Sequence, residues 1–328
     1  MFKITLKNNK SFSCDSATTI FDAAKKAGIV LDHSCLNARC RSCIVKVVSG
    51  ITEDREEELV LSEKEKNENF ILSCNAKPLS NLKLDIEDLG EIKLFEKKII
   101  PSKISVIEKL TDDILKIVLR LPPNSNFNFN SGQYVSIIKG NINRSYSIAN
   151  CSDHKNQLEF FIKNYKNGLM SEYFFKEAKI NDLLRIEGPL GTFFLRDSSF
   201  NNIIFLATGT GIAPIKSILQ ELEESSLGYQ NKNFWVIVGA RYQEDLFWEP
   251  NFKTLNIKYI PVLSRQENDW NGAKGYVQDI VLKQQIDLEN TQVYACGSNN
   301  MINSAKELFL KNNLKEMNFF SDAFVQSN

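Results

Sequence analysis

Hydrophobic and polar residues alternate near both ends of the first ninety positions. FKITL (2–6) and LKLDI (82–86) each place an apolar side chain at every second position, which is typical of a half-buried β-strand. Between them, SATTIFDAAKKAG (16–28) begins with polar residues and ends at Gly28, as a helix does. The pattern predicts two strands with a helix between them in the sequence.

Several short alternating runs follow residue 100, after a charged stretch (91–99) that we interpret as a linker. Strands of this length, closely spaced and separated by turn residues, predict a small antiparallel β-barrel over residues 100–198. The runs are ISVIEKL, ILKIVLRLPP, GQYVSII, RSYSIAN and LEFFIKN.

The pattern changes again near residue 199. The segment NNIIFLATGTGIAPIKSILQELEES combines an apolar strand, a glycine turn and an amphipathic helix, as at the opening of a nucleotide-binding sheet. Three further apolar strands, FWVIVGAR, IKYIPVLS and QVYACG, are separated by helical stretches. We therefore expect a parallel sheet over residues 199–328. The chain as a whole is predicted to be multidomain, with α+β and α/β parts.

Composition narrows the classes of function. The chain has 328 residues, 40 Lys+Arg against 40 Asp+Glu, and 43% hydrophobic residues. Without a basic excess, nucleic acid is not an expected partner, and no run approaches the roughly 18 apolar residues of a membrane span. MFKITLKNNKSF lacks the apolar core of a signal peptide. We therefore expect a cytoplasmic protein whose cysteines are ligands, catalysts or packing residues rather than disulfides.

Four of the seven cysteines form a recognisable pattern. Cys35, Cys40 and Cys43 are spaced C-x4-C-x2-C, and Cys74 follows after a gap of thirty residues. This is the plant-type ligand spacing of a [2Fe-2S] cluster. The alternatives are a zinc site, which prefers two C-x2-C pairs, and unrelated buried thiols. A Rieske centre would need two histidine ligands in paired motifs, and the two histidines of this chain do not form them.

The cysteine loop and its flanking strands and helix resemble the β-grasp ferredoxins, which implies a self-contained [2Fe-2S] domain over residues 1–90. That family usually carries glycine where this chain has Ala38, and often where it has Arg41. Glycine lets the backbone approach the sulfides and present N–H groups to them. The four cysteine ligands are present, but Ala38 and Arg41 leave two properties undetermined: the conformation of the loop and the reduction potential of the cluster.

RSYSIAN resembles the Arg-x-Tyr-Ser motif of the ferredoxin–NADP reductase superfamily, whose barrel holds FAD. The resemblance implies that Arg144 binds the FAD pyrophosphate with its planar fork of donors. It also places Tyr146 against the flavin and Ser147, as a catalytic residue, near flavin N5. GLMSEYFF and GPLGTFFL match two further segments of that superfamily. In the first of them, Gly168 and Ser171 are the implied contacts to phosphate at a helix N-terminus.

The glycine turn and the end of the last apolar strand supply the nucleotide site. Gly209, Thr210 and Gly211 lack the third glycine of the Rossmann fingerprint but match the superfamily's own pyrophosphate turn. Cys296 and Gly297 end a strand where such sheets bind ligands. The resemblance places Cys296 beside the nicotinamide as a catalytic residue; the alternative is a small buried hydrophobe.

The C-terminal segment FFSDAFV carries one more candidate. From its position near the C-terminus, Phe324 is a candidate to lie against the flavin face, as C-terminal aromatic residues do elsewhere in the superfamily. Asp322 is a second candidate, for a polar contact near the nicotinamide. The alternative is a frayed terminus.

Domain order and the segments RSYSIAN, RIEGPLGTFF, VYACGS and FFSDAFV resemble the CDP-6-deoxy-Δ3,4-glucoseen reductase family over nearly the whole chain. The resemblance implies a reductase, with NADH preferred, that passes electrons from NADH to FAD to [2Fe-2S]. The implied acceptor is the iron–sulfur, pyridoxamine-phosphate-dependent dehydrase of 3,6-dideoxysugar biosynthesis. The alternatives are the reductase component of a ring-hydroxylating dioxygenase or multicomponent monooxygenase, and a non-enzymatic redox carrier or sensor.

Overall fold

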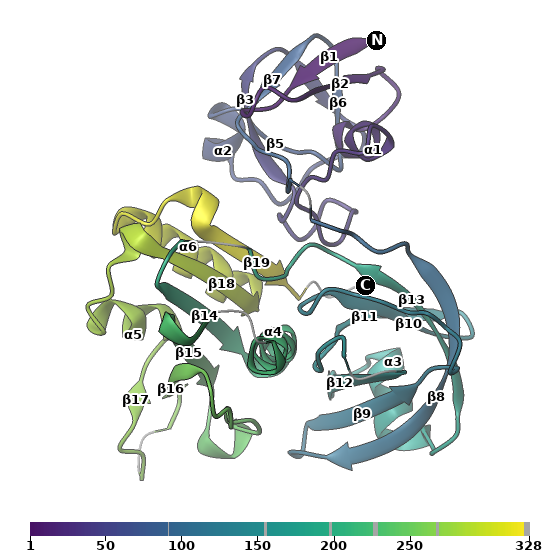
Figure 1. Cartoon of the computed structure of the whole chain (residues 1–328), viewed down its shortest axis with the longest axis vertical. Coiled ribbons are helices and arrows are strands. Elements are labelled where there is room, and N and C mark those ends of the chain that lie inside the picture. The colour runs from purple at the N-terminus through teal and green to yellow at the C-terminus, as the bar shows by residue number, and fades with distance from the viewer. Residues whose placement is uncertain (91, 154–155, 197–198, 226–228, 267–268, 325–328) are drawn as a thin grey trace. The chain divides into compact units, whose positions relative to one another are not determined.

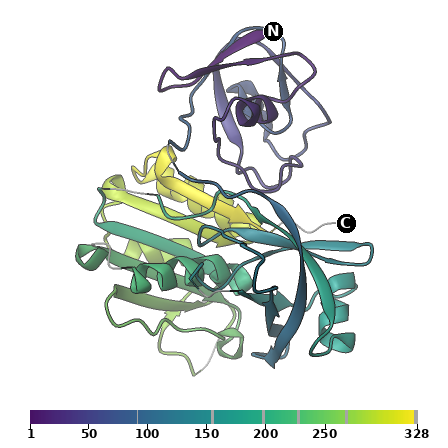
Figure 2. The same cartoon turned by 45° about the vertical axis from the view of Figure 1, so that its right-hand side comes forward.

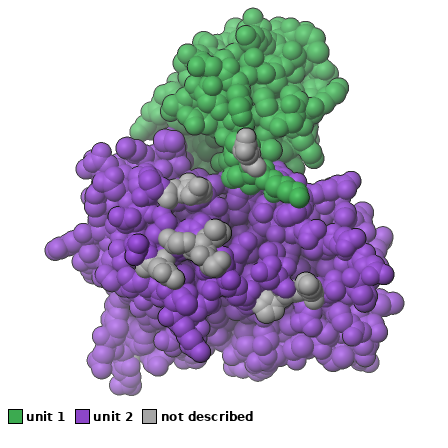
Figure 3. Space-filling model, in the orientation of Figure 1, with its two compact units in different colours: residues 1–93 green, residues 94–328 purple. Residues whose placement is uncertain are grey.

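The computed structural model divides the chain into two compact units, residues 1–93 and 94–328 (Figures 1 and 3). No helix among the residues that the structure describes is long and apolar enough to cross a membrane. The structure describes every residue except 91, 154–155, 197–198, 226–228, 267–268 and 325–328.

The N-terminal unit is built on a mixed sheet. Its five strands lie in the order β2-β1-β7-β3-β5, and β1 pairs in parallel with β7 and antiparallel with β2. A separate antiparallel ribbon joins β4 to β6. The elements are β1 (Phe2–Thr5), β2 (Ser11–Cys14), α1 (Ile20–Lys26), β3 (Ile44–Ser49), β4 (Thr52–Asp54), α2 (Glu63–Asn67), β5 (Phe70–Leu72), β6 (Ala76–Pro78) and β7 (Leu82–Leu84).

The helix predicted over 16–28 is shorter in the structure, because Thr19 caps it. The Thr19 hydroxyl accepts the backbone N–H of Asp22 at 3.2 Å, which fixes the start of α1 at the next residue. The chain leaves the helix at Gly28, whose φ of 75° is left-handed. The alternation of the two predicted strands correctly indicates which side chains face the core, since Ile4 and Leu84 are fully buried.

The first half of the second unit is an antiparallel barrel. Its strands lie in the order β11-β10-β13-β8-β9-β12, and the two outermost strands contact each other, which closes the sheet. A short helix that continues into one π-helical turn covers part of it. The elements are β8 (Lys98–Lys109), β9 (Ile114–Arg120), β10 (Tyr134–Lys139), β11 (Ile142–Ser147), β12 (Gln157–Lys163), α3 (Leu169–Glu172), the π turn Tyr173–Glu177 and β13 (Leu183–Leu190).

The second half is a parallel sheet in the order β17-β16-β15-β14-β18-β19, with every pairing parallel. Helix α4 packs on β14 and β18, and α6 packs on β18 and β19 (Figure 2). The elements are β14 (Asn202–Thr208), α4 (Ile212–Glu224), β15 (Asn233–Ala240), β16 (Asn256–Leu263), β17 (Ala273–Lys274), α5 (Val277–Lys283), β18 (Thr291–Gly297), α6 (Asn299–Lys311) and β19 (Phe319–Ala323). Short 3-10 turns lie at Gly209–Gly211, Tyr229–Asn231, Gln243–Asp245, Leu288–Asn290 and Glu316–Asn318.

The barrel and the parallel sheet of this unit share one apolar core. Phe161 and Phe193 of the barrel half pack in the same buried cluster as Phe205 of β14. Helix α4 is also tied to the barrel by hydrogen bonds: Lys216 Nζ donates to the Ala149 carbonyl at 2.9 Å, and Ser217 Oγ donates to that of Asn150 at 2.7 Å. These contacts fix the end of β11 beside the start of α4.

Candidate functional site

The four predicted cluster ligands lie in two close pairs within the N-terminal unit. Cys43 and Cys74 have their sulfur atoms 3.2 Å apart. The backbone N–H of Cys35 approaches the Cys40 sulfur at 3.3 Å, and the Cys40 N–H approaches the Cys35 sulfur at the same distance. The antiparallel pairing of β3 with β5 brings the second pair together, because Ile44 and Leu72 are partners in the ladder.

The backbone of the loop is arranged around sulfur. The N–H groups of Asn37 and Arg39 point to the Cys35 sulfur at 3.5 and 3.4 Å. The pKa of Cys35 falls to about 6, first because the Cys40 thiol donates to it and then because these N–H groups stabilise the thiolate. The thiolate is the form that binds metal, so the loop favours the ligand state of Cys35.

The two pairs of thiols match the ligand set of a two-iron cluster. A [2Fe-2S] cluster takes four cysteines, two for each iron. The pairs Cys35–Cys40 and Cys43–Cys74 therefore fit that group.

The two departures from the ferredoxin pattern adopt the conformation that glycine would supply. Ala38 has φ 58° and Arg41 has φ 66°, both in the left-handed region. A non-glycine residue is uncommon there. The loop therefore keeps the glycine-like path, and the Ala38 N–H is close enough to Cys74 to help lower the pKa of its thiol, after the larger effect of the Cys43 thiol.

The predicted flavin residues of the barrel lie on two neighbouring elements. Arg144, Tyr146 and Ser147 are on β11, and α3 contacts this strand. The ring of Tyr146 meets Phe174 edge-on, with 6.2 Å between centroids. The Arg144 guanidinium makes one local bond to the carbonyl of the preceding residue at 2.8 Å, which leaves most of its five donors for a ligand.

Gly168 and Ser171 form a tight turn at the start of α3. The Ser171 hydroxyl lies 2.8 Å from the Gly168 carbonyl and 3.1 Å from that of Tyr165, so it is already engaged with its own loop. A Cβ at Gly168 would lie 2.5 Å from this hydroxyl. The structure therefore gives both residues a role in shaping the turn, and their contact with phosphate stays a prediction.

The glycine turn and the end of β18 meet at the carboxyl edge of the parallel sheet. A Cβ at Gly211 would lie 2.2 Å from the Cys296 carbonyl oxygen, and one at Gly297 would lie 2.2 Å from the Thr208 hydroxyl. Only glycine permits both approaches. Helix α4 begins here without a side-chain cap, so its first N–H groups lack such partners, as in helices that bind phosphate.

Residues from three distant parts of the sequence converge beside this edge. Ser147 Oγ donates to Asp322 Oδ2 at 3.4 Å, and Asp322 is the ladder partner of Cys296. Cys296 is fully buried, and burial followed by the nearby Asp322 charge raises the pKa of its thiol. The backbone N–H of Phe324 donates to the Gly297 carbonyl at 2.9 Å. The structure thus brings together the predicted residues of β11, β18 and the C-terminal segment.

Thr208 is a residue of this site that the sequence reasoning missed. Its hydroxyl accepts the backbone N–H of Ser298 at 3.3 Å and faces Gly297. The signal was its position, because it is the last residue of an apolar strand directly before the glycine turn.

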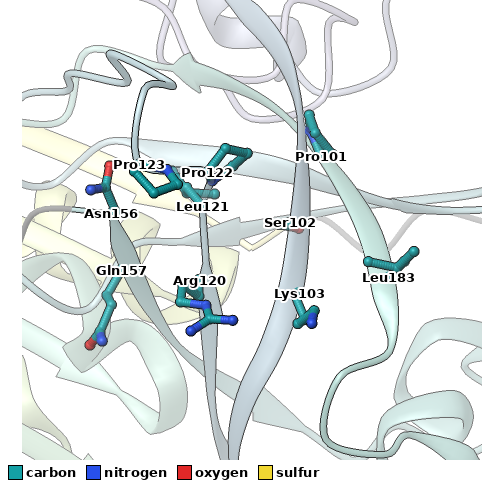
Figure 4. A pocket seen from close by; sticks show the side chains of 10 residues that line it. All are labelled: Pro101, Ser102, Lys103, Arg120, Leu121, Pro122, Pro123, Asn156, Gln157 and Leu183. Carbon is teal, nitrogen blue, oxygen red and sulfur yellow. The ribbon is translucent and has the colours of Figure 1, made fainter.

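A shallow groove of about 610 Å³ lies on the barrel away from these residues (Figure 4). It contains none of the predicted cofactor ligands. Its lining is Pro101, Ser102, Lys103, Arg120, Leu121, Pro122, Pro123, Asn156, Gln157 and Leu183. We therefore assign the cofactor chemistry to the converging residues rather than to this groove.

Comparison with known proteins agrees with these sites. The chain matches the 2Fe-2S iron-sulfur cluster binding domain over residues 4–79, the oxidoreductase FAD-binding domain over 101–195 and the oxidoreductase NAD-binding domain over 205–307. It is 39% identical over 317 residues to the CDP-6-deoxy-L-threo-D-glycero-4-hexulose-3-dehydrase reductase of Yersinia pestis, covering 96% of each chain.

The chain belongs to the CDP-6-deoxy-L-threo-D-glycero-4-hexulose-3-dehydrase reductase family. Protein RfbI of Salmonella typhimurium is 37% identical, over 98% of this chain and 96% of that relative. Among solved structures, the Amycolatopsis cytochrome P450 reductase GcoB has the same fold, with a TM-score of 0.73, 20% identity and 99% of both chains covered.

Membership of this family confirms the predicted fold class and cofactors. The protein is an oxidoreductase of the ferredoxin–NADP reductase superfamily that uses NADH, FAD and a [2Fe-2S] cluster. When bound, the FAD accepts a two-electron hydride from NADH and supplies single electrons to the cluster. Relatives of the chain are reductases that serve another protein, which is consistent with an electron-accepting protein partner.

Proposed function

We propose that this reductase delivers electrons to the iron–sulfur, pyridoxamine-phosphate-dependent dehydrase that acts on a CDP-6-deoxyhexulose in 3,6-dideoxysugar biosynthesis. The observation that carries the proposal is the 39% identity to a reductase of such a dehydrase, over 96% of both chains. Full-length coverage matters because it includes the cluster loop, from which an acceptor would take its electrons.

In this proposal the barrel residues hold the FAD. Arg144 binds the pyrophosphate, for which a guanidinium with free donors is suited. Tyr146, packed on Phe174, lies against the flavin and keeps water from one side of it. Gly168 and Ser171 shape the turn that faces the phosphates.

The nicotinamide site is proposed at the convergence of β11, β18 and the C-terminal segment. The turn at Gly209, Thr210 and Gly211 binds the NADH pyrophosphate through backbone N–H groups at the start of α4. Ser147 and Cys296 are the proposed catalytic residues. Because Cys296 is fully buried, a nicotinamide reaches it only if a covering group moves, and Phe324 is our candidate for that group.

Asp322 orients Ser147 in this site. The Ser147 hydroxyl donates to the Asp322 carboxylate, which directs one oxygen lone pair of Ser147 away from the acid. With FAD bound, Ser147 would therefore act as a hydrogen-bond acceptor, toward the N5–H of the reduced flavin. Asp322 is itself 5% exposed, so the pair is shielded from solvent.

Purified dehydrase tests this function directly. We expect the reductase with NADH to reduce the dehydrase under anaerobic conditions, and sugar deoxygenation to require both proteins. An oxygenase component that accepts electrons much faster than the dehydrase would instead favour the monooxygenase or dioxygenase alternative. We also propose a cytoplasmic location, in keeping with seven free cysteines.

A further inference from the structure

Arg41 occupies an unusual place in the cluster loop. It lies between two predicted ligands, directly after Cys40, and its backbone is left-handed with φ 66°. A left-handed conformation is strained for a residue that carries a side chain. A glycine would avoid that strain, and the interactions of the Arg41 side chain help to offset it.

Those interactions reach a different segment of the N-terminal unit. One guanidinium nitrogen, Nη1, donates to the Val60 carbonyl at 2.5 Å and to Glu65 Oε2 at 3.2 Å. The other, Nη2, donates to Glu65 Oε1. Arg41 and Glu65 thus form a bidentate pair, which is the strong geometry for arginine and carboxylate. Both side chains are less than a quarter exposed.

Glu65 is held in place by the start of helix α2. The Ser62 N–H and hydroxyl both donate to Glu65 Oε2 at 2.8 Å, and Ser62 in turn caps the helix. Burial alone would raise the pKa of Glu65, but the bonds from Arg41 and Ser62 outweigh it and lower the pKa to about 2. Glu65 is therefore an anion at neutral pH.

The carbonyl that Arg41 binds belongs to a turn that is fixed as well. Glu58, the last residue of the acidic run EDREEE, is 5% exposed, and its carboxylate accepts the N–H groups of Val60 and Leu61. Lys66 of α2 pairs with the same carboxylate at 3.7 Å. The segment from residue 58 to 66 is therefore an ordered brace to which the cluster loop is attached through Arg41.

The pair also introduces two opposite charges into the loop, because Arg41 directly follows the predicted ligand Cys40 and its partner is the Glu65 carboxylate. Reduction of a cluster adds one negative charge, so a nearby cation favours the reduced form and a nearby anion opposes it. Because Arg41 and Glu65 are paired, their effects largely cancel in the intact protein. Removal of either partner leaves the other charge uncompensated.

We propose that the Arg41–Glu65 pair is a positioning device that replaces glycine in the cluster loop, and that its balanced charges keep the reduction potential of the [2Fe-2S] cluster from shifting. Arg41 holds the loop in its left-handed path by attachment to the brace at residues 58–66. Glu65 neutralises the cation that an arginine directly after Cys40 introduces.

Redox titration of full-length Arg41→Gly and Glu65→Gln variants tests the proposal, with the electron paramagnetic resonance signal of the reduced cluster as the readout. We expect opposite shifts. Arg41→Gly leaves the Glu65 anion and lowers the potential, and Glu65→Gln leaves the Arg41 cation and raises it. Each shift corresponds to roughly a three- to tenfold change in the equilibrium constant for reduction, as expected for one charge at a partly exposed site.

Two further variants separate charge from attachment. Arg41→Lys keeps the cation without the bidentate fork, so we expect a potential near that of the wild type but severalfold faster cluster loss to an iron chelator. Arg39→Gly removes an exposed cation from the same loop and should change the potential less than Arg41→Gly. Shifts of the same sign in Arg41→Gly and Glu65→Gln, or an Arg39→Gly shift as large as that of Arg41→Gly, would overturn the proposal.

Discussion

The cluster loop and the nicotinamide region are assembled in different ways. In the N-terminal unit, three of the four predicted ligands lie within nine consecutive positions, and the fourth joins them through a single strand pairing. In the second unit, Ser147 and Asp322 are 175 positions apart and meet only because the barrel and the parallel sheet share a core. The comparison indicates that the first site depends on loop geometry and the second on the packing of whole domains.

The change with the largest expected effect removes a cluster ligand. Cys74→Ser should abolish the [2Fe-2S] cluster, because the Cys43–Cys74 pair loses one thiolate. FAD and the oxidation of NADH by ferricyanide should remain, because a small dye can take electrons from the flavin. Iron and labile sulfide analysis, flavin absorbance and dye reduction measure the three effects. Loss of NADH oxidation in a variant that still holds FAD would show that the sites are not independent.

Arg144→Ala should act on the second site alone. Removal of a guanidinium that binds the FAD pyrophosphate should weaken FAD binding by roughly 1.5–3 kcal/mol, the range for hydrogen bonds to a charged group. Titration of the FAD-free protein with FAD measures this change, and the cluster absorbance should be unaltered. Unchanged FAD affinity would place Arg144 outside the flavin site.

Gly211→Ala tests whether close packing of the glycine turn on β18 is needed. Its Cβ would lie 2.2 Å from the Cys296 carbonyl oxygen, so the strand end must shift. We expect a loss of about 1–3 kcal/mol of stability and slower hydride transfer. Gly209→Ala is the matched control, because open space surrounds its Cβ and only the left-handed φ of 54° is strained. Equal effects on hydride transfer in the two variants would contradict a special role for the Gly211 contact.

Acid should weaken the N-terminal unit through Glu65. Its pKa is about 2 in the folded protein and roughly 4.3 when unfolded. A carboxylate with a depressed pKa stabilises the fold above its unfolded pKa, and this stability is lost as the pH falls from about 4.3 toward 2. Urea unfolding followed by amide hydrogen exchange of the N-terminal unit should show the advantage of wild type over Glu65→Gln shrinking by about 1 kcal/mol between pH 5 and pH 3. An advantage that is constant with pH would argue against an ionised Glu65 in the brace.

The sequence was most informative where the relevant pattern is local. The C-x4-C-x2-C spacing, the strand alternation of residues 2–6 and the GTG turn each lie within a short stretch, so they predicted the cluster, the sheet and the nucleotide-binding half. The family comparisons confirm these predictions of fold and cofactors. The roles of individual ligands stay predictions.

Contacts between distant segments were harder to predict. Nothing near Arg41 indicates that its guanidinium binds Glu65, 24 positions later, because the partner depends on how α2 is placed. The buried Glu58 shows the same limit, since a run of acidic residues usually indicates solvated surface. The helix predicted from residue 16 begins only at Ile20 in the structure. The cause is local, because the Thr19 side chain caps the helix at that point.

A substitution of Phe324 should have the smallest effect, because it changes access to the second site without removing a ligand. Its backbone is tied to Gly297 and its ring packs on the shared core. An aromatic ring that covers the flavin competes with nicotinamide for the same face. Phe324→Ala should therefore change the apparent affinity for NADH by a few-fold, about 0.5–1.5 kcal/mol for an aromatic contact, or alter the charge-transfer absorbance of the reduced complex. Phe320→Ala, which removes a ring stacked on Tyr294 in the same segment, is the control for a general disturbance of β19. If Phe324→Ala has wild-type flavin spectra and NADH kinetics, the ring does not cover the site, and another group must open the way to Cys296.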